Sequence, residues 1–204
     1  AQLTQYPSNV KQAVTRMLVG GGIGLDEIAF NPPSDFGSSE VVADDDVQES
    51  RVVFHPNGGG APFQRNANLG SDVNAGQWKY VGDIAIENLG TADAELIAMA
   101  SDIPSGICDS VNEKLGLPKI GETDADMEGA IEYVSSTNSE SGSIRQDTNG
   151  TTGLAGRVLL DDGDTGLTTL GESSGDSDLN AQRFACTTSN GGNGNVYYHV
   201  LATR

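Results

Sequence analysis

One short motif in the chain has the spacing of a serine hydrolase. Residues 171–175 (Gly-Glu-Ser-Ser-Gly) match the G-x-S-x-G pattern of the nucleophile elbow, and His199 follows them in the required order. That elbow needs a strained turn from a buried strand into a helix, which exposes the serine beside an oxyanion hole. Here the motif lies in a run of Gly, Ser and Asp, no helical pattern follows it, and His199 belongs to a strand-like run. We therefore interpret the match as a chance occurrence in a polar loop.

Histidine and cysteine are too few for a catalytic zinc site. The chain has two of each, His55, His199, Cys108 and Cys186, and it contains neither HExxH nor CxxC. His55 has the setting of a loop residue, and His199 that of a strand residue that packs or faces solvent. Because no constellation of catalytic side chains is present, we predict that the protein is not an enzyme.

Calcium is the one cofactor that the side chains leave open. Two loops put carboxylate or amide oxygens at alternate positions, as hard oxygen coordination requires. Neither completes an EF-hand, since the second has Ala181 in place of the glycine and Thr187 in place of the bidentate Glu. Asp clusters in so acidic a chain are usually a solvated face, so both interpretations remain. The candidate ligands are Asp161, Asp162, Asp164, Asp176, Asp178 and Asn180.

The charge of the chain excludes several partners. Its 204 residues carry a formal net charge of −18, with 11 Lys and Arg against 29 Asp and Glu. Nucleic acid and anionic membrane surfaces both require clustered Lys and Arg, so neither is an expected partner. No run of about eighteen apolar residues occurs, so no segment of the given sequence is predicted to span a membrane. At this length we predict a single domain over residues 1–204.

The N-terminal region has the clearest helical pattern. Apolar residues at i, i+3, i+4, i+7 and i+8 predict an amphipathic helix over residues 8–19, with Pro7 just before it. Lys11, Gln12 and Arg16 fall outside the apolar stripe. The stripe is narrow, so it needs a sheet or another helix to cover it. It consists of Val10, Ala13, Val14, Met17 and Leu18.

The rest of the chain predicts strands with a helical insertion. Two short helices are expected within residues 91–116, the first over 91–99 and the second over 105–115. Segments 135–153 and 171–195 are rich in Ser, Gly, Asn, Asp and Thr and predict surface loops. This order is typical of the α+β class with an antiparallel sheet. Apolar, β-branched or aromatic runs predict strands at 51–54, 78–86 (with a bulge at Gly82), 157–160, 184–186 and 196–203.

Cys108 and Cys186 form a widely separated pair in an acidic, Lys-poor chain, a composition typical of secreted proteins. They either form a disulfide or stay reduced as small buried hydrophobic residues. A bridge would close a loop of roughly eighty residues and contribute on the order of 4 kcal/mol in the chain-entropy model. Cys108 falls on the apolar face of the second predicted helix, which suits a structural bridge.

Taken together, the N-terminal helix, the sheet and the late cysteine resemble the type IV pilin family and its pseudopilin relatives. Residues 10–18 look like the soluble second half of the long pilin helix. Residues 103–116 are similar to a segment of certain Gram-negative prepilin-type proteins, and so is the ending from Ala185-Cys186 through a Gly/Asn loop to residues 197–201. The hydrophobic half-helix of the family is not in this sequence, so we expect an ectodomain from which that part has been removed.

The resemblance implies a structural role in a type IV pilus-like filament or a type II secretion pseudopilus. The partners would be other pilin or pseudopilin subunits, contacted through the N-terminal helix, and only the missing segment would enter the membrane. The location would be the periplasm, the cell surface or an extracellular filament of a Gram-negative, salt-adapted bacterium. If Cys108 and Cys186 pair, residues 109–185 would form much of the exposed face. The alternative is a secreted calcium-dependent binding or adhesion module, which predicts a ligand pocket or an exposed aromatic platform.

Overall fold

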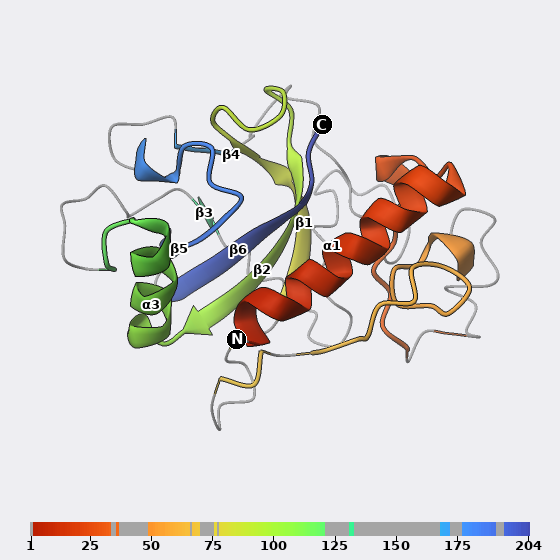
Figure 1. Ribbon diagram of the computed structural model, residues 1–204, viewed down its shortest axis with the longest axis horizontal. Coiled ribbons are helices and arrows are strands. Elements are labelled where there is room, and N and C mark those ends of the chain that lie inside the picture. The colour runs from red at the N-terminus through yellow and green to blue at the C-terminus, as the bar shows by residue number, and fades with distance from the viewer. Residues whose placement is uncertain are drawn as a thin grey trace.

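The computed structural model confirms the α+β class. It describes residues 2–33, 36, 49–65, 67–69, 76, 78–120, 131–132, 168–171, 177–190 and 194–204. In this part of the chain a long N-terminal helix lies across one face of a six-stranded sheet, and a shorter helix packs against strands of the same sheet (Figure 1). No helix among the described residues is long and apolar enough to cross a membrane.

Helix α1 spans Gln2–Gly21 and is longer than the predicted helix over residues 8–19. Pro7 lies inside it, and the prediction that Pro7 precedes the helix is wrong. A proline in a helix interior removes a backbone hydrogen bond and costs about 3 kcal/mol. Leu3 and Tyr6, in the first turns, are both buried in the core. Burial of two large side chains contributes about as much as the proline costs, so tertiary packing extends the helix.

Three long antiparallel strands form the centre of the sheet. They are β1 (Trp78–Ile86), β2 (Glu95–Ile103) and β6 (Asn195–Ala202), with β2 in the middle. β5 (Phe184–Asn190) pairs antiparallel with the other side of β6. The predicted strands at 78–86, 184–186 and 196–203 are therefore confirmed, although β5 runs four residues into a segment predicted to be loop.

The two outer strands are short and parallel to their neighbours. β3 (Ile131–Glu132) pairs with the end of β5, and β4 (Thr168–Leu170) pairs with the end of β1. The sheet order is β3-β5-β6-β2-β1-β4, so the sheet is mixed rather than wholly antiparallel.

β1 contains a bulge, as the sequence predicted at Gly82, and the bulge moves the side chains that follow it to the other face of the sheet. The register with β2 shifts between Val81 and Ile84. Before the shift Trp78 packs in the core under α1, whereas after it Ile84 packs in the core on the opposite face. An extra residue in one strand has this effect because side chains alternate with a period of two.

The prediction of a helix over residues 91–99 is wrong, because most of that segment belongs to β2. Leu96 and Ala98 pack toward α1, while Ile97 and Met99 pack in the core of the opposite face. A strand buried on both faces reads as a continuous apolar run, which periodicity alone does not separate from a buried helix.

The second predicted helix is confirmed as α3 (Ser105–Leu115), which Gly116 ends in a left-handed conformation at φ 72°. The predicted strand at 51–54 is wrong in part. Its first residue ends a 3-10 turn, η3 (Glu49–Arg51), and Val52 makes only an isolated parallel bridge, to Ala29. Two further 3-10 turns that the structure describes in full are η1 (Leu25–Glu27) and η5 (Ser177–Leu179). The predicted strand at 157–160 and the predicted loop at 135–153 lie outside the described residues.

Candidate functional site

The inner side of α1 packs on the sheet, mainly against β6. Val10, Ala13, Val14 and Met17 are each at most 4% exposed, and Leu18 is partly buried against the same core. These are the five residues that the sequence places on the packing face. The sheet and, at Met17, the turn around Val53 and Gly59 therefore cover the apolar stripe of α1, which leaves the opposite side of the helix for other contacts.

The outer side of α1 is polar and carries no acidic residue. Gln5, Asn9, Gln12, Arg16 and Val19 are exposed, and their spacing puts them on one stripe of the helix. Val19 is 83% exposed, and it is the one exposed large apolar side chain among the described residues. The Arg16 guanidinium donates a hydrogen bond to the carbonyl oxygen of Gly59. We call these five exposed residues the outer stripe of α1.

A buried histidine lies in β6 beneath α1. His199 is 7% exposed, and its Nδ1 shares a hydrogen bond of 2.9 Å with the hydroxyl of Tyr197. The ring of Phe184 stacks on it at a centroid distance of 5.4 Å. Burial, and then the charge of Lys11, lower the pKa of His199 to about 4, so the ring is neutral at pH 7. Burial also raises the pKa of the Tyr197 hydroxyl.

Two tyrosine hydroxyls join the start of α1 to β1. The hydroxyls of Tyr6 and Tyr80 lie 3.1 Å apart, and the backbone N–H of Gln64 donates to Tyr6 at 3.2 Å. Burial raises the pKa of both tyrosine hydroxyls. The hydrogen bond between them opposes this rise at Tyr6, whereas at Tyr80 that bond and the charge of Tyr6 add to it. Tyr6 packs against the ring of Trp78 with a centroid distance of 5.2 Å. These contacts fix the first turns of α1, which the sequence pattern did not predict to be helical.

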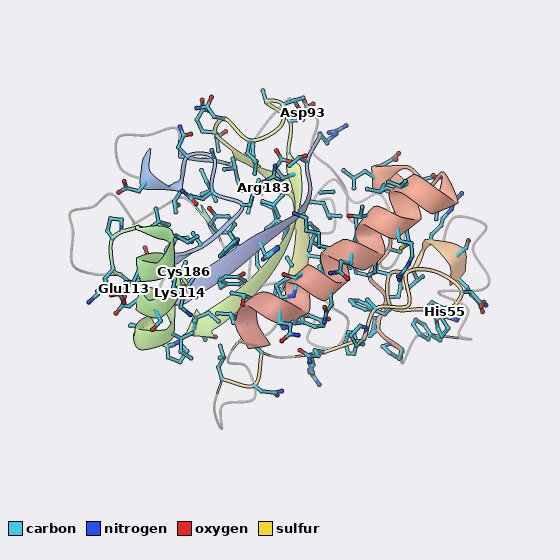
Figure 2. The ribbon with its side chains drawn as sticks, viewed as in Figure 1. His55, Asp93, Glu113, Lys114, Arg183 and Cys186 are labelled. Atoms are coloured by element: carbon cyan, nitrogen blue, oxygen red, sulfur yellow. A yellow bond between two sulfur atoms is a disulfide. The ribbon has the colours of Figure 1, made fainter. Side chains whose placement is uncertain are left out.

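The disulfide between Cys108 and Cys186 is present, and it fastens α3 to β5. Asn112, one turn after Cys108, is fully buried and bonds both backbone groups of Cys186. Its Oδ1 accepts from the Cys186 N–H at 2.9 Å, and its Nδ2 donates to the Cys186 carbonyl at 3.1 Å. The amide thus pairs with the outer edge of β5 as a neighbouring strand would, which protects that edge from other strands. Figure 2 shows Cys186 beside α3.

A buried carboxyl group lies where β2 begins. Glu95 is fully buried, its Oε2 accepts from the backbone N–H of Arg204 at 3.2 Å, and its Oε1 has no hydrogen-bond partner. Burial raises the pKa of this carboxyl to about 7, while the nearby charges of Arg183 and Arg204 oppose the rise and that of Asp93 adds to it. Gly90 leaves the room for it, since a Cβ there would lie 2.7 Å from Oε1.

The candidate calcium ligands are described only in part. Asp161, Asp162, Asp164 and Asp176 lie outside the described residues. Asp178 is exposed on η5, and the Oδ1 of Asn180 accepts a hydrogen bond of 3.2 Å from the amide of Asn88. Within the described part of the chain no three His, Cys, Asp or Glu side chains gather as a metal site.

The serine-hydrolase motif is also described only at its first residue. Gly171 packs against the backbone of Asn180, and residues 172–175 lie outside the described part. His199 lies on a strand with its Nδ1 bonded to Tyr197. The other histidine, His55, belongs to a turn, where its Nε2 lies 3.7 Å from a carboxylate oxygen of Glu49.

Sequence reasoning missed three buried residues whose polar groups bond to other elements: Asn112, Glu95 and Tyr6. Asn112 follows Cys108 by four residues, so the helical period places both on one face of α3. That spacing is a signal that could have found Asn112. Glu95 stands at the head of an apolar run, and nothing in the sequence indicates that its carboxyl is buried.

No protein-family model, curated protein or solved structure matches the chain at a significant level. The architecture itself, an N-terminal helix packed on a mixed sheet, is consistent with the pilin-like fold that the sequence resembles. The disulfide indicates folding in an oxidising compartment outside the cytoplasm.

Proposed function

We propose that this chain is the ectodomain of a non-enzymatic subunit of a type IV pilus-like filament or a type II secretion pseudopilus. The observation that carries the proposal is the way α1 packs, with one face buried and the other exposed. Its apolar face lies along the sheet and its opposite stripe stays exposed, as a subunit needs when the same rod also contacts neighbours. The partners are other pilin or pseudopilin subunits, contacted through α1, in the periplasm, at the cell surface or in an extracellular filament of a Gram-negative bacterium.

The disulfide and the tyrosine contacts support the same role. Cys108–Cys186 ties α3 to the sheet, and the Tyr6–Tyr80 pair ties the start of α1 to it. A filament subunit transmits load through its helix, so cross-links between that helix, the sheet and α3 help it to keep its shape.

No observation favours the alternative, a calcium-dependent binding or adhesion module. An aromatic platform needs exposed rings, whereas the tryptophan and the four tyrosines of the described part are buried. These are Trp78, Tyr6, Tyr80, Tyr197 and Tyr198.

The gene sequence upstream of Ala1 tests the proposal. We expect it to encode a prepilin-type leader followed by about twenty apolar residues that continue α1 as one helix. A cleavable secretory signal that ends directly before Ala1 would contradict the filament proposal and favour the binding module.

A further inference from the structure

Helix α3 has few contacts that hold it on the sheet. Two of its eleven residues are fully buried, and they are Cys108 and Asn112. The apolar face of the helix is therefore small, and its position depends on the disulfide and on Asn112. Three apolar side chains of α3 pack against the core but are only partly buried: Ile107, Val111 and Leu115.

The Asn112 amide makes three hydrogen bonds that fix its orientation. Its Oδ1 accepts from the Cys186 N–H at 2.9 Å, and its Nδ2 donates to the carbonyl oxygens of Cys186 at 3.1 Å and Pro118 at 3.2 Å. If the amide were turned over, its NH2 group would face the N–H of Cys186 and its oxygen would face two carbonyl oxygens. The amide therefore binds residue 186 in a single arrangement.

Asn112 and the disulfide bring together the same two segments. Asn112 follows Cys108 by one helical turn on the same face of α3, and it binds the backbone of the other cysteine. The Cα atoms of Cys108 and Cys186 lie 5.3 Å apart, a separation that a disulfide spans without backbone movement. The amide thus holds Cys186 against the turn of α3 that carries Cys108, through bonds that do not involve sulfur.

The bridge is inaccessible while α3 stays in place. Both cysteines are 0% exposed, so a reductant reaches the sulfur atoms only after α3 separates from β5. Hydrogen bonds that oppose this separation therefore protect the bridge and keep the two thiols together once it is open.

We propose that Asn112 is a positioning residue for the disulfide, a second clamp that holds α3 on β5 while the two cysteines are reduced. A chain that folds before it is oxidised then already has its thiols side by side. A chain whose bridge is reduced keeps α3 in place until the bridge forms again. This inference concerns how the fold is held and does not depend on the proposed function.

Equilibration of the purified chain with glutathione measures the effect. One cysteine thiolate attacks oxidised glutathione and releases one glutathione thiolate, and the second cysteine thiolate attacks the mixed disulfide and releases the other. The two electrons and two protons that the cysteines lose pass to the two glutathione molecules. After alkylation of the free thiols, mass spectrometry gives the oxidised fraction, and hence the effective concentration of one cysteine at the other.

Four variants separate the role of the amide from general stability. Asn112→Ala should lower the effective concentration by about five- to hundredfold, since each of its two bonds to Cys186 contributes about two- to tenfold to an equilibrium. Asn112→Asp keeps the size of the side chain but turns an oxygen toward two carbonyl oxygens, so it should lower the value at least as much. Ser110→Ala, exposed on the same helix, and Val14→Ala, in the core under α1, should leave it nearly unchanged.

A second measurement does not require the Asn112 variants to fold. Cys108→Ala, kept under reducing conditions, has no bridge but retains Asn112 and the backbone of Cys186. We expect the backbone N–H of Cys186 to stay protected from hydrogen exchange in this variant, by about a hundredfold or more relative to an unfolded chain. NMR of the labelled protein resolves this single amide.

Three results would overturn the proposal. An unchanged effective concentration in Asn112→Ala would mean that the amide does not position the cysteines. An equal fall in Val14→Ala would mean that Asn112 acts only through the stability of the whole fold. Loss of protection at Cys186 in Cys108→Ala would mean that the bridge alone holds α3 on β5.

Discussion

The buried carboxyl of Glu95 should make the stability of the protein depend on pH in an unusual direction. Its folded-state pKa is raised from 4.5 to about 7, so between these values the folded protein keeps a proton that the unfolded chain has released. The stability from this group is complete below pH 4.5 and is lost as the pH rises through 7. At 1.36 kcal/mol per pKa unit, the loss amounts to at most about 3 kcal/mol.

His199 should act in the opposite direction over nearly the same range. Its folded-state pKa is lowered from 6.5 to about 4, so the unfolded chain binds the proton first. The stability from this group is complete above pH 6.5 and is lost as the pH falls through 4, again by at most about 3 kcal/mol. The two contributions therefore oppose each other between pH 4.5 and 6.5. In the wild-type chain they should largely cancel, so the free energy of unfolding should change little with pH on their account.

The substitution Glu95→Gln separates them. The free energy of unfolding, measured by urea denaturation at steps from pH 4.5 to 7.5, should rise more steeply with pH in the variant than in the wild type. The difference between wild type and variant should fall by about 2–3 kcal/mol across this range. Glu113→Gln, at an exposed position on α3 (Figure 2), is the matched control and should give a difference that does not change with pH.

The reasoning would be refuted by a constant difference between wild type and Glu95→Gln over the whole range. It would also be refuted by a difference that grows with pH, because that sign requires a carboxylate that folding stabilises. His199→Asn gives an independent check, since it should make the stability fall more steeply with rising pH than in the wild type.

Three further substitutions test the packing around α1 and α3. Asn112→Ala leaves both backbone groups of Cys186 without their partner, and it should lower the free energy of unfolding by about 2–4 kcal/mol in urea denaturation. Val14→Ala on the inner side of α1 should cost about 2 kcal/mol, while Val19→Ala on the outer stripe should stay within about 0.5 kcal/mol. Replacing Cys108 and Cys186 together by alanine should cost about 4 kcal/mol, as the loss of a long closed loop predicts.

Each of these has a clear contrary outcome. A change below 0.5 kcal/mol in Asn112→Ala would mean that water replaces the amide at the edge of β5. Equal losses for Val14→Ala and Val19→Ala would contradict the assignment of the inner and outer sides of α1. An unchanged unfolding midpoint in the double cysteine variant would mean that the bridge does not constrain the unfolded chain.

Sequence patterns predicted α1, α3 and β6, for different reasons. α1 has a single apolar stripe with a period of 3.6, and α3 ends at a glycine, so both were recognisable as helices. β6 is buried on both faces but is rich in β-branched and aromatic residues, which identified it as a strand. β2 is also buried on both faces, yet its Leu, Ala and Met are good helix formers, so local propensity gave the wrong element.

The polar residues of the site could not be predicted in the same way. The start of α1 depends on Tyr6 meeting Tyr80, which is 74 residues away in the chain. The role of Asn112 depends on its distance from Cys186, and the raised pKa of Glu95 depends on burial beside Gly90 and Arg204. Contacts between distant segments carry no periodic signal in the sequence.

The central claim, that the chain is a filament subunit assembled through α1, is tested most directly on the full gene product in its own cells. Filaments are sheared from the surface or pelleted from the periplasm, and an antibody raised against residues 1–204 is used for immunogold electron microscopy. The proposal predicts gold along the filaments. It also predicts that Gln12→Glu, on the outer stripe of α1, lowers the fraction of filaments that carry gold without changing the fold of the ectodomain. A protein found only as unassembled monomer, with bare filaments, would contradict it.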